Sequence, residues 1–209
     1  MSCNVTESGW IVPAEEPAQE PLRLRPATAA DADALALVGA ATFLEAFTWM
    51  LPGEDILAHC TKNHSAESYR AALAKPETRI TLAVTVRGGS PVGYAMVTAP
   101  DLPSFAVQPG DIELKRIYLL SRFRSRRRTP VVDHAGRPQP ELSPGQALMN
   151  AAIRDAQSMG CSRLLLGTHE NNTRAIDFYR RNGFAEAGTR TFQVGSQCCC
   201  DLIFARPLL

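Results

Sequence analysis

Runs of alternating or continuous hydrophobic residues predict a series of short strands along the chain. In residues 21–28, Leu22 and Leu24 fall on one face of the first strand. Two more strands flank Arg-Gly-Gly-Ser, a loop typical of a β-hairpin. The largely apolar segment Arg-Leu-Leu-Leu-Gly-Thr-His predicts a strand that is buried on both faces. The strands after the first are expected at 79–86, 91–99, 111–120, 163–169, 184–194 and 199–205.

Helical periodicity predicts two helices in the first half of the chain. The sequence Thr28-Ala-Ala-Asp31 has the form of a capping box, in which the Thr and Asp side chains each accept a backbone N–H. It opens an Ala- and Leu-rich helix that runs towards Phe47. A second helical segment covers 66–74 and ends before Pro76, because the residue before a proline disfavours the helical conformation.

Two further helices are predicted in the second half, each with marked ends. Ser143 is the expected N-cap of the first, with Pro144 at its first position, Gln146 completing a capping box and Gly160 at its end. Asn172 caps the second helix, Thr-Arg-Ala-Ile-Asp-Phe-Tyr-Arg-Arg-Asn, which Gly183 closes.

These elements predict an α/β (α+β) domain over residues 21–209, preceded by a flexible tail. Residues 1–20 are polar, contain proline and lack periodicity. In the middle of the chain, strand 111–120, a loop, a helix and strand 163–169 form a βαβ unit. The helix begins beyond the carboxyl end of the first strand, where free N–H groups and the helix dipole favour a phosphate.

Charge adds one local feature. The net charge of +1 gives no reason to expect nucleic acid or a membrane surface as partner. Five arginines nevertheless fall within seven residues, and the segment 121–142 carries a local excess of +4. This segment indicates an anion-binding region on a slightly acidic body. A nucleic-acid role is not favoured, because Phe123 alone is interleaved with the arginines and no recognition-helix motif is present.

The cysteines and the apolar segments suggest a cytoplasmic protein. The six cysteines form no C-x-x-C pair, and no histidine lies at ligand spacing from the 198–200 run. No metal is expected, and the cysteines are interpreted as small buried residues, with a metal or redox site as the alternative. Residues 1–20 carry acids and prolines rather than the apolar segment of a secretory leader. The longest apolar run, 34–44, is too short to span a bilayer.

The residues from Asn172 to Phe184 have the pattern N-x-x-A-I-x-F-Y followed by G-F, and Leu-Lys-Arg-Ile-Tyr-Leu-Leu and Leu-Leu-Leu-Gly-Thr-His-Glu-Asn precede them as strands. With this motif the sequence resembles the GNAT superfamily of acyl-CoA-dependent N-acetyltransferases. The resemblance covers residues 21–207. It implies a mixed, mostly antiparallel sheet of six to seven strands flanked by helices, with a central βαβ cofactor unit. It also implies acetyl-CoA as the co-substrate.

The cofactor loop departs from the family pattern Q/R-x-x-G-x-G/A. We interpret it as split by an insertion, 127–142, although a simpler alignment pairs Gly145 with Ala147 and leaves Leu142 in the basic position. Pro144 has no N–H to donate, so we expect CoA to bind with altered contacts. Pro130, Gly136 and two further prolines indicate a mobile insertion. The cofactor residues implied by the split version are Arg124, Ser125, Arg126, Gly145, Gln146 and Ala147.

The resemblance also implies roles in catalysis. The backbone amides of Ile117 and Leu119 correspond to those that hold the thioester and pantetheine, and Asn172 to a contact with the cofactor arm. Tyr179 corresponds to the general acid that protonates the leaving thiolate, although with Ala175 and Phe178 it could form a packed helical face instead.

The general base is less clear. Glu113 is the first candidate, unless it is a solvated strand carboxylate paired to Lys115 or Arg116. His169 at the end of its strand is an alternative.

The acceptor is expected to be a small-molecule amine. Segments 41–47, 112–118, 187–195 and 201–203 resemble the PaiA-type polyamine acetyltransferases, which implies a polyamine acceptor. Glu45, Glu54 and Asp55 would then attract the polycation, or they are ordinary surface charges.

The predicted reaction is direct attack of a primary amine in a ternary complex. The alternative is a GNAT-fold binding or regulatory protein without catalysis, and homodimer formation through the terminal strands is left open.

Overall fold

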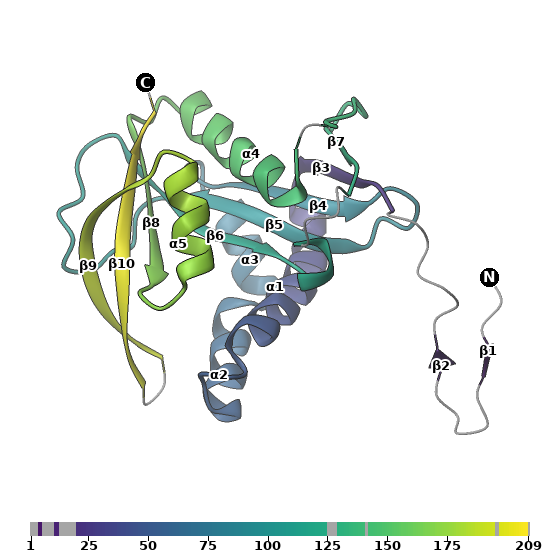
Figure 1. Cartoon of the computed structure of the whole chain (residues 1–209), viewed down its shortest axis with the longest axis horizontal. Coiled ribbons are helices and arrows are strands. Elements are labelled where there is room, and N and C mark those ends of the chain that lie inside the picture. The colour runs from purple at the N-terminus through teal and green to yellow at the C-terminus, as the bar shows by residue number, and fades with distance from the viewer. Residues whose placement is uncertain are drawn as a thin grey trace.

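The computed structural model describes residues 4–5, 11–12, 20–124, 129–140, 142–194 and 197–208 (Figure 1). Within these residues the main sheet has eight strands in the order β7-β3-β4-β5-β6-β8-β10-β9. Its strands are β3 (Leu22–Pro26), β4 (Arg79–Thr85), β5 (Pro91–Thr98), β6 (Asp111–Leu119), β7 (Val131–Val132), β8 (Arg163–His169), β9 (Ala185–Val194) and β10 (Gln197–Pro207). The helices are α1 (Ala32–Phe47), α2 (Gly53–Asn63), α3 (Ala66–Leu73), α4 (Pro144–Ser158) and α5 (Thr173–Arg181), with short 3₁₀ turns η1 (Ala29–Asp31) and η2 (Ser121–Phe123).

The sheet confirms the predicted mixed, mostly antiparallel architecture. Only two of its neighbouring pairs are parallel in the described chain, β3 with β7 and β6 with β8. The strand in excess of the expected six to seven is β7, which the insertion supplies. A separate two-strand pair, β1 (Asn4–Val5) with β2 (Ile11–Val12), lies within the segment expected to be a flexible tail, and that tail stays a prediction.

Helices cover both faces of the sheet, which explains why its central strands are apolar on both sides. Helices α4 and α5 pack on one face, and α1 and α3 on the other (Figure 1). All residues of β5 after Pro91 are buried. The buried face of α4 combines small and large apolar residues: Pro144, Ala147, Leu148, Met149, Ala151, Ala152, Ile153 and Ala156.

The predicted helix boundaries are confirmed where a side chain caps the helix. Thr28 and Asp31 form the predicted capping box, and Asp31 also forms an ion pair with Arg25. Asn172 accepts the amide of Ala175 at the start of α5, and Gly183 ends that helix with φ of 78°. Helix α2 was not predicted, because its N-cap is Pro52, which offers no capping side chain.

The described part of the insertion is ordered at the edge of the sheet, where mobility had been expected. Val131 is 2% exposed and joins the core under α4. The amide of Leu22 donates to the carbonyl of Pro130 at 2.8 Å, which ties the insertion to β3. The carboxylate of Asp133 accepts three hydrogen bonds around the following turn, where Gly136 adopts φ of 78°. The proline- and glycine-rich composition therefore shapes an edge strand and a turn here.

The cysteines only partly match the expectation of burial. Cys60 and Cys161 are partly buried, whereas Cys200 is exposed. Among the described residues, no group of three or more His, Cys, Asp or Glu side chains is arranged to hold a metal ion. None of the helices in the described ranges is long and apolar enough to cross a membrane.

Candidate active site

Strands β6 and β8 pair for only part of their length, and this opens the centre of the sheet. The parallel pairing covers Asp111, Ile112 and Glu113 of β6 and stops there. The remaining residues of β6 stay paired with β5 on the other side. From Leu114 onward, the β8-facing edge of β6 therefore has no strand partner in the described chain.

The alternation of hydrogen bonds along β6 identifies the amides on that open edge. The amide of Leu120 donates to Val92 at 2.9 Å, so Leu120 points its backbone groups towards the β5 side. Successive residues of an antiparallel strand point their N–H groups to opposite sides. Ile117 and Leu119 consequently direct their amides towards the edge of β6 that is no longer paired with β8. The resemblance to GNAT proteins implies that the thioester and pantetheine bind at these amides.

A β-bulge at Lys115 changes which face of the sheet the β6 side chains reach. The register with β5 passes from Leu114 to Arg116, and Lys115 is the extra residue. Leu114 and Ile117 thus both pack in the core under α4, while Tyr118 packs against the cluster under α1 and α3. Bulges re-aim side chains in this way. Here the bulge directs Arg116 to the α1–α3 face just beyond Glu113.

The start of α4 offers a reduced set of anion donors. Ser143 accepts the amide of Gln146 at 3.3 Å, and Pro144 has no N–H. No described residue accepts the amide of Gly145, and a Cβ added there would meet no atom within 4 Å. The space beside Gly145 is therefore open. Ala147 is buried and donates its amide to Ser143 within the first turn, so it contributes packing rather than a free donor.

The side chain of Gln146 has a structural task that differs from the predicted capping box. Its amide nitrogen donates to Asn150 and to Asn182, and Asn182 in turn donates to the carbonyl of Phe178. Only the Ser143 half of the predicted box forms, because the Gln146 side chain points along α4 and across to α5. These contacts fix the start of the cofactor helix against the end of α5.

Arg124 forms an ion pair within the protein. Its guanidinium donates to Glu45 of α1 at 2.9 Å, and Glu45 also accepts the amide and hydroxyl of Ser121 at 2.9 and 3.2 Å. Arg174 of α5 donates to the carbonyl of Arg124. The loop after β6 is thus attached to helices on both faces of the sheet. Ser125 and Arg126, the other predicted residues of this half of the cofactor loop, lie outside the described residues.

Tyr179 is held by aromatic packing at the end of α5. Its ring packs against Phe178, Phe184 and Phe204, so the packed face considered from the sequence is present. Burial, with the nearby Tyr118 phenol, raises the pKa of Tyr179 well above its usual value of 10.0. No described residue forms a hydrogen bond with its hydroxyl. Packing therefore fixes the ring and leaves a protonated hydroxyl available. Asn172 lies exposed at the other end of the helix.

Glu113 is buried rather than solvated, although it does pair with Lys115 as the alternative from the sequence expected. It is 2% exposed, accepts the amide of Asp101 at 2.8 Å and lies 3.4 Å from the ammonium of Lys115. Burial raises its pKa, and the charge of Lys115 opposes that effect. Glu113 is the last residue of β6 that pairs with β8. His169, the alternative base, is half-buried and accepts the amide of Asn171 with Nδ1 at 3.2 Å.

The acids expected to bind a polycation are not assembled for that purpose. Glu45 is occupied by Arg124 and Ser121, as described above. Asp55 is buried near the start of α2, where its Oδ2 atom has no partner among the described groups, and Glu54 is exposed. The three carboxylates therefore have different environments and form no common site.

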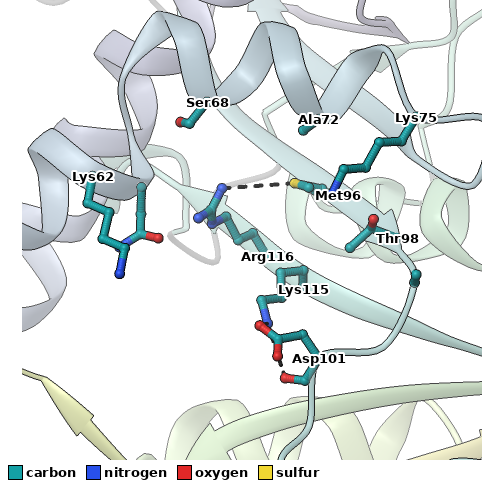
Figure 2. Close-up of a pocket in the computed structure, with 11 residues that line it drawn as sticks. Lys62, Ser68, Ala72, Lys75, Met96, Thr98, Asp101, Lys115 and Arg116 are labelled. Atoms are coloured by element: carbon teal, nitrogen blue, oxygen red, sulfur yellow. Dashed lines mark hydrogen bonds and ion pairs between the residues drawn. The ribbon is translucent and has the colours of Figure 1, made fainter.

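A pocket that the sequence did not indicate lies on the α1–α3 face beside Glu113. Its volume is about 220 Å³ (Figure 2). Residues from α2, α3, β5 and β6 line it, so no short motif could have revealed it. The lining residues are Lys62, Asn63, Ser68, Ala72, Lys75, Met96, Thr98, Ala99, Asp101, Lys115 and Arg116.

Comparison with known proteins agrees with this architecture. The Acetyltransferase (GNAT) family profile matches residues 144–184, which span α4, β8 and α5. Uncharacterized N-acetyltransferases of Mycobacterium bovis and Mycobacterium tuberculosis are each 31% identical to the chain over 180 residues, covering 86% of this chain and 99% of theirs.

Solved structures share the fold at lower identity. The PaiA N-acetyltransferase of Thermoplasma acidophilum, solved with coenzyme A, superposes with a TM-score of 0.65 at 16% identity, covering 89% of this chain and 98% of its own. A GNAT-family acetyltransferase of Staphylococcus aureus superposes with a TM-score of 0.61 at 15% identity, covering 90% and 99%. Strands β6 and β8 pair for only part of their length, and the chain is similar to the mycobacterial proteins over 86% of its residues. The chain therefore belongs to the GNAT family of N-acetyltransferases, which take their acetyl group from acetyl-CoA.

Proposed function

We propose that the chain transfers an acetyl group from acetyl-CoA to the primary amine of a small molecule, by direct attack in a ternary complex. The observation that carries this proposal is the open edge of β6, which presents the amides of Ile117 and Leu119 beyond the last residue paired with β8, Glu113. Bound acetyl-CoA supplies a thioester carbonyl that an amine can attack. The residues of the chain then have to polarise that carbonyl, deprotonate the amine and protonate the leaving sulfur.

Each task has a candidate group. The Ile117 and Leu119 amides donate hydrogen bonds to the donor substrate. The Gly145 amide and the N-terminal dipole of α4 favour its phosphates. Glu113, acting through water, accepts the proton that the ammonium loses. Tyr179, a phenol that is protonated at neutral pH, gives its proton to the sulfur as the carbon–sulfur bond breaks.

The polyamine acceptor stays a prediction. It rests on the resemblance to PaiA-type enzymes, and similarity at 16% identity supports the fold alone. The carboxylates that would have received a polycation are occupied, buried or dispersed. Spermidine therefore belongs in the first panel of amines as one acceptor among several.

Calorimetric titration of acetyl-CoA, with CoA as comparison, tests whether the split cofactor loop still binds its ligand. Micromolar binding, followed by CoA release in the presence of an amine, is the expected result. Absence of binding at millimolar acetyl-CoA would favour the alternative, a GNAT-fold binding or regulatory protein without catalysis.

Tyr179→Phe tests the proposed general acid. Loss of a general acid lowers rates by about 10²–10⁴-fold. We expect kcat to fall by at least about a hundredfold while the melting temperature and the affinity for acetyl-CoA stay unchanged, because the hydroxyl has no partner in the described protein. Tyr118→Phe is the matched variant on the neighbouring phenol. If it alone abolishes turnover, Tyr118 rather than Tyr179 donates the proton.

A further inference from the structure

The pocket beside Glu113 concentrates positive charge from separate parts of the chain. Lys62 comes from α2, Lys75 follows α3, and Lys115 and Arg116 come from β6. The chain has three lysines in total, and all three line this pocket. In Figure 2 the guanidinium of Arg116 points towards α3, and the Lys75 side chain extends towards Met96 beside it.

The counter-charges near the pocket are too few to neutralise these groups. Asp101 pairs with Lys115 at 3.1 Å, and the buried Glu113 contacts the same ammonium. Lys62 and Lys75 form no ion pair or hydrogen bond through their side chains in the described structure. Even with Glu113 ionised, four cations face two carboxylates, and the pocket keeps a formal excess of two positive charges.

Arg116 carries the strongest part of this argument. Its side chain is partly buried, its guanidinium lies 5.5 Å from the centre of the Tyr69 ring, and Nη1 approaches the sulfur of Met96 at 3.9 Å. No described carboxylate lies within ion-pair distance of it. A partly buried guanidinium without an anionic partner is costly, and a bidentate oxyanion is the ligand that it fits best.

A hydrogen-bonded cluster behind Arg116 holds it in place without neutralising it. Tyr69 accepts or donates to Tyr94 at 2.6 Å and to Nδ1 of His64 at 2.8 Å. Burial raises the pKa of both tyrosines, so they remain neutral phenols. Burial and the charge of Arg116 lower the pKa of His59 to about 4 and that of His64 to about 3, so neither histidine adds charge at neutral pH.

The position of the pocket relates it to the acceptor rather than to the donor. Lys115 and Arg116 lie on β6 between Glu113, the candidate base, and Ile117, the first amide of the open edge. The start of α4, where the phosphates of the donor are expected, is on the opposite face of the sheet. An acceptor that enters from the α1–α3 face would therefore meet the cations before its amine reaches Glu113.

We infer that the acceptor carries an anionic group beside its amine, a carboxylate or a phosphonate, and that Arg116, Lys62 and Lys75 bind this group in the pocket. The inference rests on the proposed function and specifies its substrate class. A polyamine would bring like charges into the pocket and is disfavoured for the same reason. The volume of about 220 Å³ suits a small amino acid or aminophosphonate rather than a polymer.

The test compares amines that differ only in the anionic group. Each scaffold is supplied as the aminocarboxylate, the aminophosphonate and the neutral carboxamide, with spermidine as the polycation, and CoA release is measured. We expect kcat/KM for an anionic form to exceed that for its carboxamide by about tenfold or more, since a charged group matched to a partly buried guanidinium contributes a charge-assisted hydrogen bond. The carboxylate and phosphonate arms distinguish the two kinds of oxyanion. Equal or better turnover of the carboxamide or of spermidine would overturn the inference.

Variants locate the effect in the pocket. Lys62→Gln and Lys75→Gln change exposed side chains and keep the fold, and Arg116→Gln removes the central charge. Each should raise KM for the anionic acceptor and leave KM for acetyl-CoA unchanged. Arg87→Gln, in the exposed β4–β5 hairpin, is the matched loss of one charge elsewhere. If KM for acetyl-CoA rises instead, the pocket serves the donor and the inference is wrong.

Direct binding separates failure of this inference from failure of the proposed function. If no amine is acetylated, binding of the same aminocarboxylates, aminophosphonates and carboxamides is followed by ligand-observed NMR with the full chain. Preferential binding of the anionic forms, lost in Lys75→Gln, would support the pocket assignment although the function had failed. Absence of any preference up to about 10 mM, a standard free energy of only about −2.7 kcal/mol, would overturn the assignment.

Discussion

Arg122 and Arg124, the two described arginines of the run at 122–128, and the four cations of the pocket differ in their neighbours. In the run, Arg124 is ion-paired with Glu45 and Arg122 lies 5.1 Å from the ring of Phe123. In the pocket, residues distant in sequence converge, and Asp101 and Glu113 are the only carboxylates among the described residues that pair with them. For Arg122 and Arg124, a place in a charge cluster of the sequence is therefore not enough to indicate an anion site. What decides is whether the folded chain brings counter-charges to the same place.

The largest effect is expected on kcat/KM when Glu113, the candidate general base beside the pocket, is replaced. Because burial raises the pKa of Glu113 above 4.5, its ionised, basic form is lost when the pH falls below that raised pKa. For Glu113→Gln we expect kcat/KM to fall by about a hundredfold or more, and the acidic limb of the pH profile to disappear. A profile of kcat/KM against pH for both proteins measures this. An unchanged acidic limb would assign the base elsewhere, with His169→Gln as the next variant.

Gly39→Ala disturbs the hydrogen-bonded cluster of Tyr69 and His64 that packs beside Arg116, and it leaves the arginine run unchanged. A Cβ at Gly39 of α1 would collide with the Tyr69 hydroxyl and lie 2.5 Å from Nδ1 of His64. Overpacking of this kind costs about 1–3 kcal/mol, which in a chain of this size lowers the melting temperature by several degrees. We also expect KM for the acceptor to rise. The control is Gly53→Ala, where a Cβ meets no atom within 4 Å. Equal melting temperatures of the two variants would show that Tyr69 and His64 can move to accommodate the added Cβ without loss of stability.

The smallest effect is expected in the arginine run. Glu45→Gln removes the anionic partner of Arg124 and weakens the hydrogen bonds from Ser121. Because both side chains are partly exposed, the loss in free energy of unfolding should be about 1 kcal/mol. Arg124→Gln should cost a similar amount, and the double variant should cost less than the sum of the two. Additive losses in denaturant titrations would show that Arg124 is not coupled to Glu45.

The sequence was most informative where signals are local. Ser143, Asn172 and Gly183 each mark a helix end through hydrogen bonds or backbone conformations within a few residues, and the structure confirms them. Helix α2 was missed because Pro52 offers no capping group. Strand β7 was missed because two residues have no readable periodicity, and its partner β3 lies about a hundred positions earlier.

The features of the candidate site were harder to predict because they depend on register and tertiary packing. Whether Lys115 occupies a bulge is decided by pairing with β5, and the bulge sets the direction of Arg116. Gln146 matches both a capping box and a cofactor contact by its position, yet its side chain bonds to Asn182 on another helix. The pocket assembles from four elements. Neither composition nor spacing carries that information.

The pairing of β7 with β3 also bears on the solubility of the protein. Unpaired N–H and C=O groups on an outer strand are templates for pairing with another chain. The insertion occupies this position along Leu22 and Arg23, while Arg25 and Pro26 protect the rest of β3, since charge and proline discourage pairing at an edge. A chain shortened by residues 127–142 would leave that outer strand bare. The segment that interrupts the cofactor loop thus helps to keep separate molecules from joining edge to edge.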